Sequence, residues 1–260
     1  MNRLASHNAS VAAAFSAAAA TYENGADVQF NVAGRLSARI AKLPLSPAPR
    51  ILEIGCGTGF LSRKLRESFR DASWTITDIS PQMLERCRAN LGPVQDTSFK
   101  VMDGEAPSFA TGERFDLICS SLAFQWFENL PATLAKLADL LVPGGHIAFA
   151  TLAEHSFSEW RRAYAKIGAD PAVLDCLPMA DIQHAFPEGG TAEVDEEHIA
   201  QPYANGHAFL RKLRQIGADM PRSGHRPAPA GTLRRVLRAF DSGPDTHVTY
   251  HVAYGVFTQR

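Results

Sequence analysis

Short apolar runs alternate with stretches of helical periodicity along the first 150 residues of the chain. The runs at residues 50–54 and 115–120 predict buried strands, because polar or glycine-rich turns follow them. Further strands are predicted at residues 73–77, 98–102 and 146–151. Apolar side chains at helical spacing predict helices at 58–69, from Ser80-Pro81 onward, and at 130–141. Strands that alternate with helices favour a Rossmann-like, doubly wound α/β fold with a mostly parallel sheet.

The alternation changes after residue 151. Helices are predicted at 155–168, 205–216 and 231–240, and strands at 192–203 and 246–258. We expect the C-terminal strand to run antiparallel and to complete the sheet, while the helices after the fifth strand form a cap. The expected organisation is an N-terminal arm and helix (1–45), a core (46–152), a helical cap with a sheet edge (153–245) and a final strand (246–260).

Composition narrows the class of protein. The 260 residues are 45% hydrophobic with a formal net charge of −1, which argues against a surface made for nucleic acid. An alanine-rich run at residues 11–20 is too short and too weakly apolar for a membrane span or a secretory signal. We interpret it as a mobile arm that leads into a helix, and we expect no membrane association.

The cysteines and histidines show no metal-binding spacing. No CxxC pair occurs among Cys56, Cys87, Cys119 and Cys176, which argues against a disulfide framework and a sulfur-ligated zinc site. His247 and His251 lie in a predicted strand, where four residues span about 13 Å, so a shared metal is not expected. The pattern favours reduced thiols in a cytoplasmic protein without a metal site.

The turn after the first predicted strand has the sequence LEIGCGTG, with glycines at Gly55, Gly57 and Gly59. Glycines allow the backbone to turn sharply and to approach a ligand closely. The helix that follows presents free N–H groups and a positive dipole end, which suit a carboxylate. Taken alone, such a loop would also fit a dinucleotide or a tight turn without a ligand.

Acidic residues around this loop distinguish between these ligands. Glu53 precedes the glycines inside a strand, where a buried acid needs a partner such as an ammonium group. Asp78 ends the second strand, where an acid can accept hydrogen bonds from both ribose hydroxyls. Asp103 and Glu105 follow the third strand, where an adenine amino group could lie. The GxGxG spacing and these acids favour S-adenosylmethionine over a nicotinamide dinucleotide.

Residues 50–151 resemble the class I S-adenosylmethionine-dependent methyltransferases, through the motifs EIGCGTG, TDIS, DGEA and VPGG. The resemblance implies that Gly55, Gly57 and Gly59 line the methionine moiety, with Glu53 behind them. It further implies a set of contacts to the nucleoside and the amine: Asp78 on the ribose, Ile79 on the adenine face, Asp103, Gly104 and Glu105 on the adenine edge, and Ser120 near the methionine amine.

A narrower resemblance extends from about residue 15 to the C-terminus. The chain is similar to the malonyl-acyl-carrier-protein O-methyltransferases of biotin synthesis in the N-terminal pattern Phe15, Ala18, Tyr22, Ala26, Gln29 and Ala33, in SSLAFQWF at 120–127, in LRKLRQIGA at 210–218 and in the ending Thr249-Tyr250. The stretch 171–197 departs from that family. The resemblance implies methyl transfer to the free carboxylate of a malonyl thioester, either on acyl carrier protein or on coenzyme A.

The candidates for contact with this substrate are a tyrosine, one of two adjacent arginines and a tryptophan. Tyr22 begins a helix that could close over the site, and its hydroxyl could hold the carboxylate. In the alternative interpretation, Tyr22 only makes a capping contact. Arg161 or Arg162 could do the same from a helix after the fifth strand, although a solvated helix face is the simpler interpretation. Trp126 could form a wall of the acyl pocket or be plain core.

Basic residues crowd the C-terminal third of the chain. They are Arg211, Lys212, Arg214, Arg222, Arg226, Arg234, Arg235 and Arg238. Since acyl carrier proteins are acidic, this region is a candidate docking surface, the alternative being a solvated pair of basic helices. Other functions compatible with the sequence are a methyltransferase of another small carboxylic acid or an isoprenoid ring, and a non-catalytic S-adenosylmethionine-binding regulator.

Overall fold

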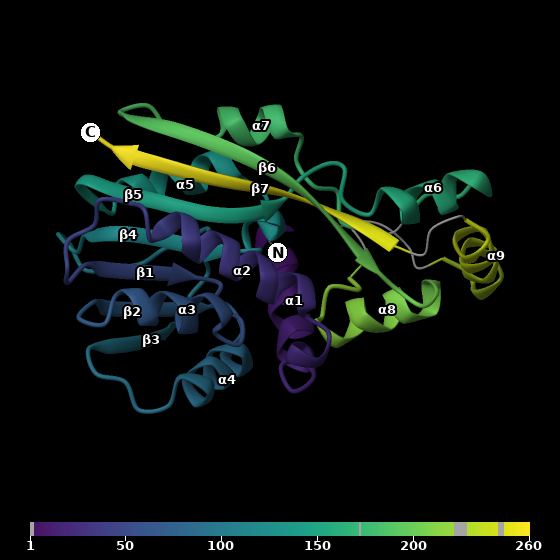
Figure 1. The fold of residues 1–260 in the computed structure, drawn as a ribbon, viewed down its shortest axis with the longest axis horizontal. Coiled ribbons are helices and arrows are strands. Elements are labelled where there is room, and N and C mark those ends of the chain that lie inside the picture. Colours follow the sequence, from purple (N-terminus) through teal and green to yellow (C-terminus); the bar gives the residue numbers. More distant parts are fainter. Residues whose placement is uncertain (1–2, 172, 221–227, 244–246) are drawn as a thin grey trace.

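A seven-stranded sheet organises the chain in our computed structural model, which describes residues 3–171, 173–220, 228–243 and 247–260 (Figure 1). The strand order is β3-β2-β1-β4-β5-β7-β6; β7 pairs antiparallel with both β5 and β6, and the other neighbouring pairs are parallel. The strands are β1 (Arg50–Ile54), β2 (Ser73–Asp78), β3 (Thr97–Val101), β4 (Phe115–Ser121), β5 (Leu141–Leu152), β6 (Gly190–Pro202) and β7 (His247–Gln259). The predicted Rossmann-like fold with an antiparallel C-terminal strand is confirmed.

Helices cover both faces of the parallel part of the sheet. They are α2 (Asp27–Ile40), α3 (Phe60–Ser68), α4 (Pro81–Leu91) and α5 (Leu130–Ala138). Successive strand residues point to opposite faces, so Ile51 packs in the cluster that contains α2 and α3, while Leu52 packs in the cluster that contains α5. The predicted cap of α4 is confirmed, since the Ser80 hydroxyl accepts a hydrogen bond from the Met83 N–H at 3.1 Å and Pro81 is the first helical residue.

The C-terminal helices build a lobe beside the sheet, on the right of Figure 1. It consists of α6 (Ser158–Lys166), α8 (Gly206–Gln215) and α9 (Ala230–Asp241). Trp160, 1% exposed, lies at its centre, with ring centroids 5.2 Å from Phe209 and 5.4 Å from Phe240. A further short helix, α7 (Met179–His184), packs against β6 and β7 and was not predicted, because prolines and glycines break the periodicity of that stretch.

Two expectations about local structure were wrong. The alanine-rich N-terminus forms the helix α1 (Arg3–Ala18) rather than an arm without structure, in line with the high helix propensity of alanine. The sequence Pro143-Gly144-Gly145 lies within β5 instead of ending a turn before it, and the predicted helix stops at Ala138. No helix among the described residues is long and apolar enough to cross a membrane.

Candidate active site

The glycine loop follows β1 and has backbone angles that favour glycine. Gly55, Gly57 and Gly59 have φ of +66°, +55° and +91°. A Cβ added to Gly55 would lie 2.5 Å from the Cβ of Ala123, so no larger residue fits there. A Cβ on Gly59 would lie 2.8 Å from Cys87 Sγ, which makes Gly59 a packing residue between α3 and α4.

Two buried carboxyl groups lie beside this loop. Glu53 is 1% exposed and accepts a hydrogen bond from the Ser62 hydroxyl at 2.5 Å; burial raises its pKa from 4.5 to about 8. Asp78 accepts hydrogen bonds from the N–H groups of Gly57 and Ser80, each at 2.8 Å. Burial raises the pKa of Asp78 to about 6, although these N–H groups oppose the shift.

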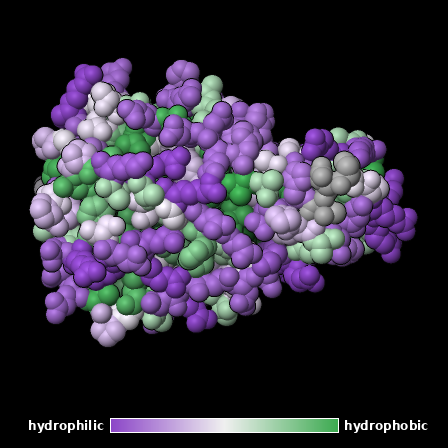
Figure 2. Space-filling view, viewed as in Figure 1, coloured by the Kyte–Doolittle hydropathy of each residue, from purple (hydrophilic) through white to green (hydrophobic). Residues whose placement is uncertain are grey.

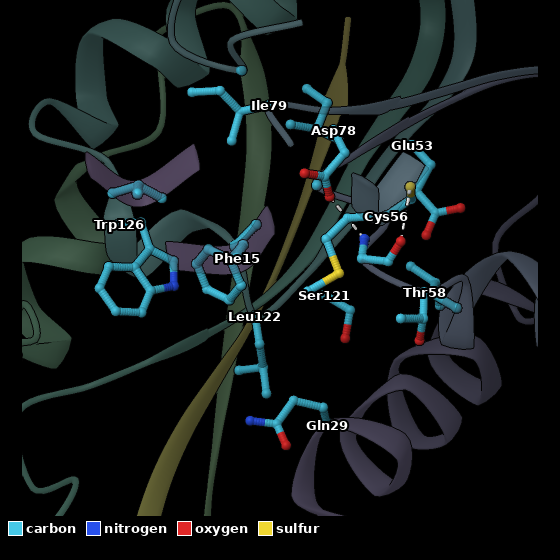
Figure 3. A pocket seen from close by; sticks show the side chains of 18 of the residues that line it. Phe15, Gln29, Glu53, Cys56, Thr58, Asp78, Ile79, Ser121, Leu122 and Trp126 are labelled. Carbon is cyan, nitrogen blue, oxygen red and sulfur yellow. Dashed lines mark hydrogen bonds between the residues drawn. The ribbon is translucent and has the colours of Figure 1, made fainter. Parts of the chain in front are cut away.

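A cavity opens between the glycine loop and the helix α1. Glu53 and Asp78 lie on one side of it, whereas Phe15 and Trp126 form an apolar wall on the other side, with ring centroids 5.5 Å apart (Figure 3). Asp103 is a third acid among the lining residues. The other described lining residues are Asn8, Val11, Tyr22, Gln29, Ala33, Ile54, Gly55, Cys56, Gly57, Thr58, Phe60, Leu61, Ile79, Met83, Met102, Gly104, Ser121, Leu122, Ala123 and Phe127. We call this space the loop cavity.

Polar contacts hold α1 over the loop cavity. Asn8 donates a hydrogen bond from Nδ2 to Asp103 Oδ2 at 2.8 Å. The hydroxyl oxygens of Ser16 and Ser80 lie 2.8 Å apart. Because Asp103 and Ser80 follow β3 and β2, these contacts place the N-terminal helix across the carboxyl ends of the strands, where open α/β sheets bind ligands.

A second cavity joins the loop cavity and extends under the C-terminal lobe. Both cavities are lined by Phe15, Tyr22, Gln29, Leu122 and Trp126. The described residues that line the second cavity alone are Gln125, Leu152, Phe157, Trp160, Tyr164, Val173, Leu174, Leu210, Leu213, Ile216, Ala218, Asp219, Met220 and Tyr250. This space, the lobe cavity, is mostly apolar and aromatic, and it meets the loop cavity at a junction formed by the five shared residues.

The structure brings most of the predicted site residues to the loop cavity. Those that line it are Tyr22, Glu53, Gly55, Gly57, Asp78, Ile79, Asp103, Gly104 and Trp126. Tyr22 opens the short helix η1 (Tyr22–Asn24), and burial raises the pKa of its hydroxyl. No role was expected from the sequence for three further residues that line this cavity: Ser121, the last residue of β4, and Leu122 and Ala123, which follow it.

Four predicted residues do not line either cavity: Gly59, Glu105, Ser120 and Arg161. The Oε1 atom of Glu105 accepts a hydrogen bond from the Asn129 N–H at 2.9 Å. Ser120 points away because side chains alternate along β4; its neighbour Ser121 lines the loop cavity instead. Arg161 donates hydrogen bonds to the carbonyl oxygen of Leu174 at 2.6 Å and to Asp175 at 3.3 Å, which turn its guanidinium from the cavities.

The sheet order and the acid-lined glycine loop define a methyltransferase of the Rossmann-like class. Residues 51–145 match a family model described as a methyltransferase domain. The fold is similar to that of the YcgJ protein of Bacillus subtilis, with a TM-score of 0.64, 13% identity, and 87% of this chain and 98% of that chain covered. It is also similar to the plantazolicin methyltransferase BpumL, solved in complex with SAH, with a TM-score of 0.55, 16% identity, and 99% and 98% coverage.

Closer sequence relatives define the family. The chain is 44% identical over 243 residues to the malonyl-[acyl-carrier protein] O-methyltransferase of Magnetococcus marinus, a match that covers 93% of this chain and 89% of that protein. It therefore belongs to the malonyl-[acyl-carrier protein] O-methyltransferase family. It is also 48% identical over 246 residues to the biotin biosynthesis bifunctional protein BioCD of Bordetella avium, a match that covers 95% of this chain and 51% of that protein.

Proposed function

We propose that this chain transfers the methyl group of S-adenosylmethionine to the free carboxylate of a malonyl thioester carried by acyl carrier protein. The observation that carries the proposal is the junction of the two cavities. An acid-lined cavity that suits the cofactor meets an apolar cavity that suits an acyl chain, and the five junction residues border both. The name of the Magnetococcus marinus relative points to the same substrate, and the name of the Bordetella avium relative points to biotin biosynthesis.

The loop cavity fits the groups of the cofactor. Asp78 is a buried acid at the end of β2 and would accept hydrogen bonds from the ribose hydroxyls, and Ile79 beside it would pack on the adenine. Asp103 and Gly104 would border the adenine edge. Glu53, with no cationic partner among the described residues, would lie behind the methionine amine. Bound there, the cofactor supplies a methyl group activated by its sulfonium.

The acceptor needs no general base. An ionised carboxylate is already a nucleophile, since a carboxylic acid in water has a pKa of about 4. The protein therefore has to exclude water and to align the carboxylate with the methyl group, which is catalysis by positioning. Tyr22, whose hydroxyl stays protonated because burial raises its pKa, would donate a hydrogen bond to the carboxylate at the junction. Trp126 would form a wall there, whereas Arg161 would first have to leave Leu174 and Asp175.

The exposed arginines of α8 and α9 would dock the acidic carrier protein. Leu210 and Leu213 of α8 line the lobe cavity, while the neighbouring Arg211 and Arg214 are exposed. The α9 residues Arg234, Arg235 and Arg238 are exposed as well. Helix α9 lies at the outer end of the lobe in Figure 1, and the surface at this end is mostly hydrophilic in the same view (Figure 2). Of the remaining basic residues, Lys212 binds Asp27 at 3.2 Å, and Arg222 and Arg226 lie outside the described residues.

One labelling experiment tests the proposed reaction. The purified protein is incubated with methyl-labelled S-adenosylmethionine and, separately, malonyl-carrier protein, malonyl-coenzyme A, a succinyl thioester and free dicarboxylic acids. Base-labile label on the malonyl thioesters alone supports the proposal. Label on another acceptor replaces the substrate, and cofactor binding without any transfer favours a regulator.

Charge reversal tests the docking surface separately. Replacing Arg234, Arg235 and Arg238 by Glu should raise the KM for malonyl-carrier protein far more than the KM for malonyl-coenzyme A, because the carrier has an extended acidic protein surface to repel, which coenzyme A lacks. The matched control reverses Arg70, an exposed residue after α3. Equal effects on both thioesters would refute docking at these arginines.

A further inference from the structure

The junction offers neutral hydrogen-bond donors to a carboxylate. Among the described residues that line the loop and lobe cavities, none is an arginine, lysine or histidine. Tyr22, Gln29 and Trp126 are the junction residues with N–H or O–H groups. A carboxylate buried at the junction requires such donors, because an ionised group without hydrogen bonds is costly to bury.

Gln29 is the junction amide that is available for a ligand. It lies in the first turn of α2, and Ala33, one turn later, lines the loop cavity from the same helix face. Figure 3 shows its side chain at the opposite end of the loop cavity from Asp78 and Ile79. It makes no side-chain hydrogen bond with any described residue.

The other glutamine of this region is already engaged. Gln125 donates a hydrogen bond from Nε2 to the carbonyl oxygen of Leu122 at 2.6 Å, and its Oε1 accepts one from the Thr151 hydroxyl at 3.3 Å. Both ends of its amide are therefore used to hold the segment after β4 against β5. Gln29 differs because it is half-buried beside both cavities and its amide has no such partners in the part of the chain that the structure describes.

We propose that the Gln29 amide donates a hydrogen bond to the substrate carboxylate, to the oxygen that is not methylated, and thereby selects a carboxylated acyl group over an uncharged one. This inference rests on the proposed function. A hydrogen bond to a charged acceptor is stronger than one between neutral groups. A neutral amide also leaves the carboxylate more of its nucleophilic charge than an ion pair with arginine would, so it orients the attacking oxygen without neutralising it.

Paired ligands and paired variants test this role. Binding of malonyl-carrier protein and acetyl-carrier protein is measured by calorimetry on enzyme saturated with S-adenosylhomocysteine, along with kcat and KM. Gln29→Ala should weaken binding of the malonyl form by about 10- to 100-fold, the usual loss for one hydrogen bond to a charged group, and should leave the acetyl form unchanged. Gln29→Glu should weaken the malonyl form further, since it sets like charges together. Asn31→Ala is the control, on an exposed residue of the same helix.

Cofactor affinity separates this role from a contact with the methionine moiety. The Kd for S-adenosylhomocysteine should stay within about twofold in Gln29→Ala. A parallel loss of cofactor affinity would show that Gln29 contacts the cofactor. An equal loss for the malonyl and acetyl forms would show that Gln29 only shapes the cavity. Either result overturns the inference, and so does unchanged binding of the malonyl form. If the wild type instead methylates another carboxylic acid, the proposed function fails, and Gln29 is then tested with that acid and its uncharged analogue.

Discussion

Replacing Glu53 by glutamine should change how the stability of the cofactor-free protein depends on pH. The Glu53 carboxyl is buried, and its only hydrogen-bond donor among the described side chains is the Ser62 hydroxyl. Burial raises its pKa from 4.5 to about 8, although the Ser62 hydrogen bond opposes the shift. The folded protein therefore keeps a proton on Glu53 at neutral pH that the unfolded chain has already lost.

This difference in protonation decides whether the free energy of unfolding rises or falls with pH. Between pH 4.5 and about 8 the folded state binds more protons than the unfolded state, so the free energy of unfolding falls as the pH rises. At about 1.4 kcal/mol per pKa unit, Glu53 alone should remove roughly 3–4 kcal/mol of stability between pH 5 and pH 8. Asp78, with a pKa raised to about 6, adds a fall of the same sign at lower pH.

Glu53→Gln removes the ionisable group and keeps a carbonyl oxygen that can accept the Ser62 hydrogen bond. The stability of the variant should decline much less from pH 6 to pH 8 than that of the wild type, so the variant should gain stability relative to the wild type as the pH rises. Urea unfolding at constant ionic strength, followed by circular dichroism, measures both curves. The exposed Glu67 of α3 provides the control, Glu67→Gln. Parallel pH curves for wild type and Glu53→Gln would show that Glu53 is not held protonated in the fold.

Three further predictions concern the site and the lobe. Gly55→Ala should lower stability by about 1–3 kcal/mol and abolish cofactor binding, because its Cβ would meet Ala123 at 2.5 Å and its φ is +66°; a wild-type Tm and cofactor titration would contradict this. Asp78→Asn should raise the cofactor Kd by about 10- to 100-fold, measured by calorimetry, since it loses a charged acceptor; an unchanged Kd would remove Asp78 from the ribose site. Trp160→Ala should cost about 3–5 kcal/mol in urea unfolding, because it empties the centre of the lobe, yet preserve cofactor affinity, since Trp160 lines only the lobe cavity. Loss of cofactor binding in the folded Trp160 variant would show that the lobe and the loop cavity are more tightly coupled than their lining suggests.

The predictable part of the site lies where the backbone itself is constrained. Gly55 and Gly57 need positive φ, and Asp78 and Asp103 follow parallel strands, so local sequence reveals them. The position of Ser120, which does not line the loop cavity, has a local cause too. Neighbouring residues of a strand face opposite sides, and a shift of one position exchanges the buried hydroxyl for the one at the cavity.

The orientation of long side chains could not be predicted in the same way. Arg161 follows the fifth strand on a helix, as expected, but its guanidinium bonds to Leu174 and Asp175 in a stretch without clear periodicity. Glu105 likewise turns to the Asn129 N–H at the start of α5. In both cases a partner from a distant or irregular segment decides where the charge points, and the pattern of residues around the side chain carries no signal of that partner.

The junction residues of the N-terminal segments, unlike the glycines and the strand-end acids, belong to no local sequence motif. Phe15, Tyr22 and Gln29 belong to three successive segments, α1, η1 and α2, that contain no glycine loop and no acid at a strand end. Phenylalanine, tyrosine and glutamine have ordinary structural roles in any helix, so their types alone do not mark a site. They line the junction because the contacts of Asn8 with Asp103 and of Ser16 with Ser80 hold this part of the chain across the glycine loop. The proposed cofactor contacts thus follow from local motifs, whereas the proposed substrate contacts depend on how the N-terminal helices dock, which only the folded chain reveals.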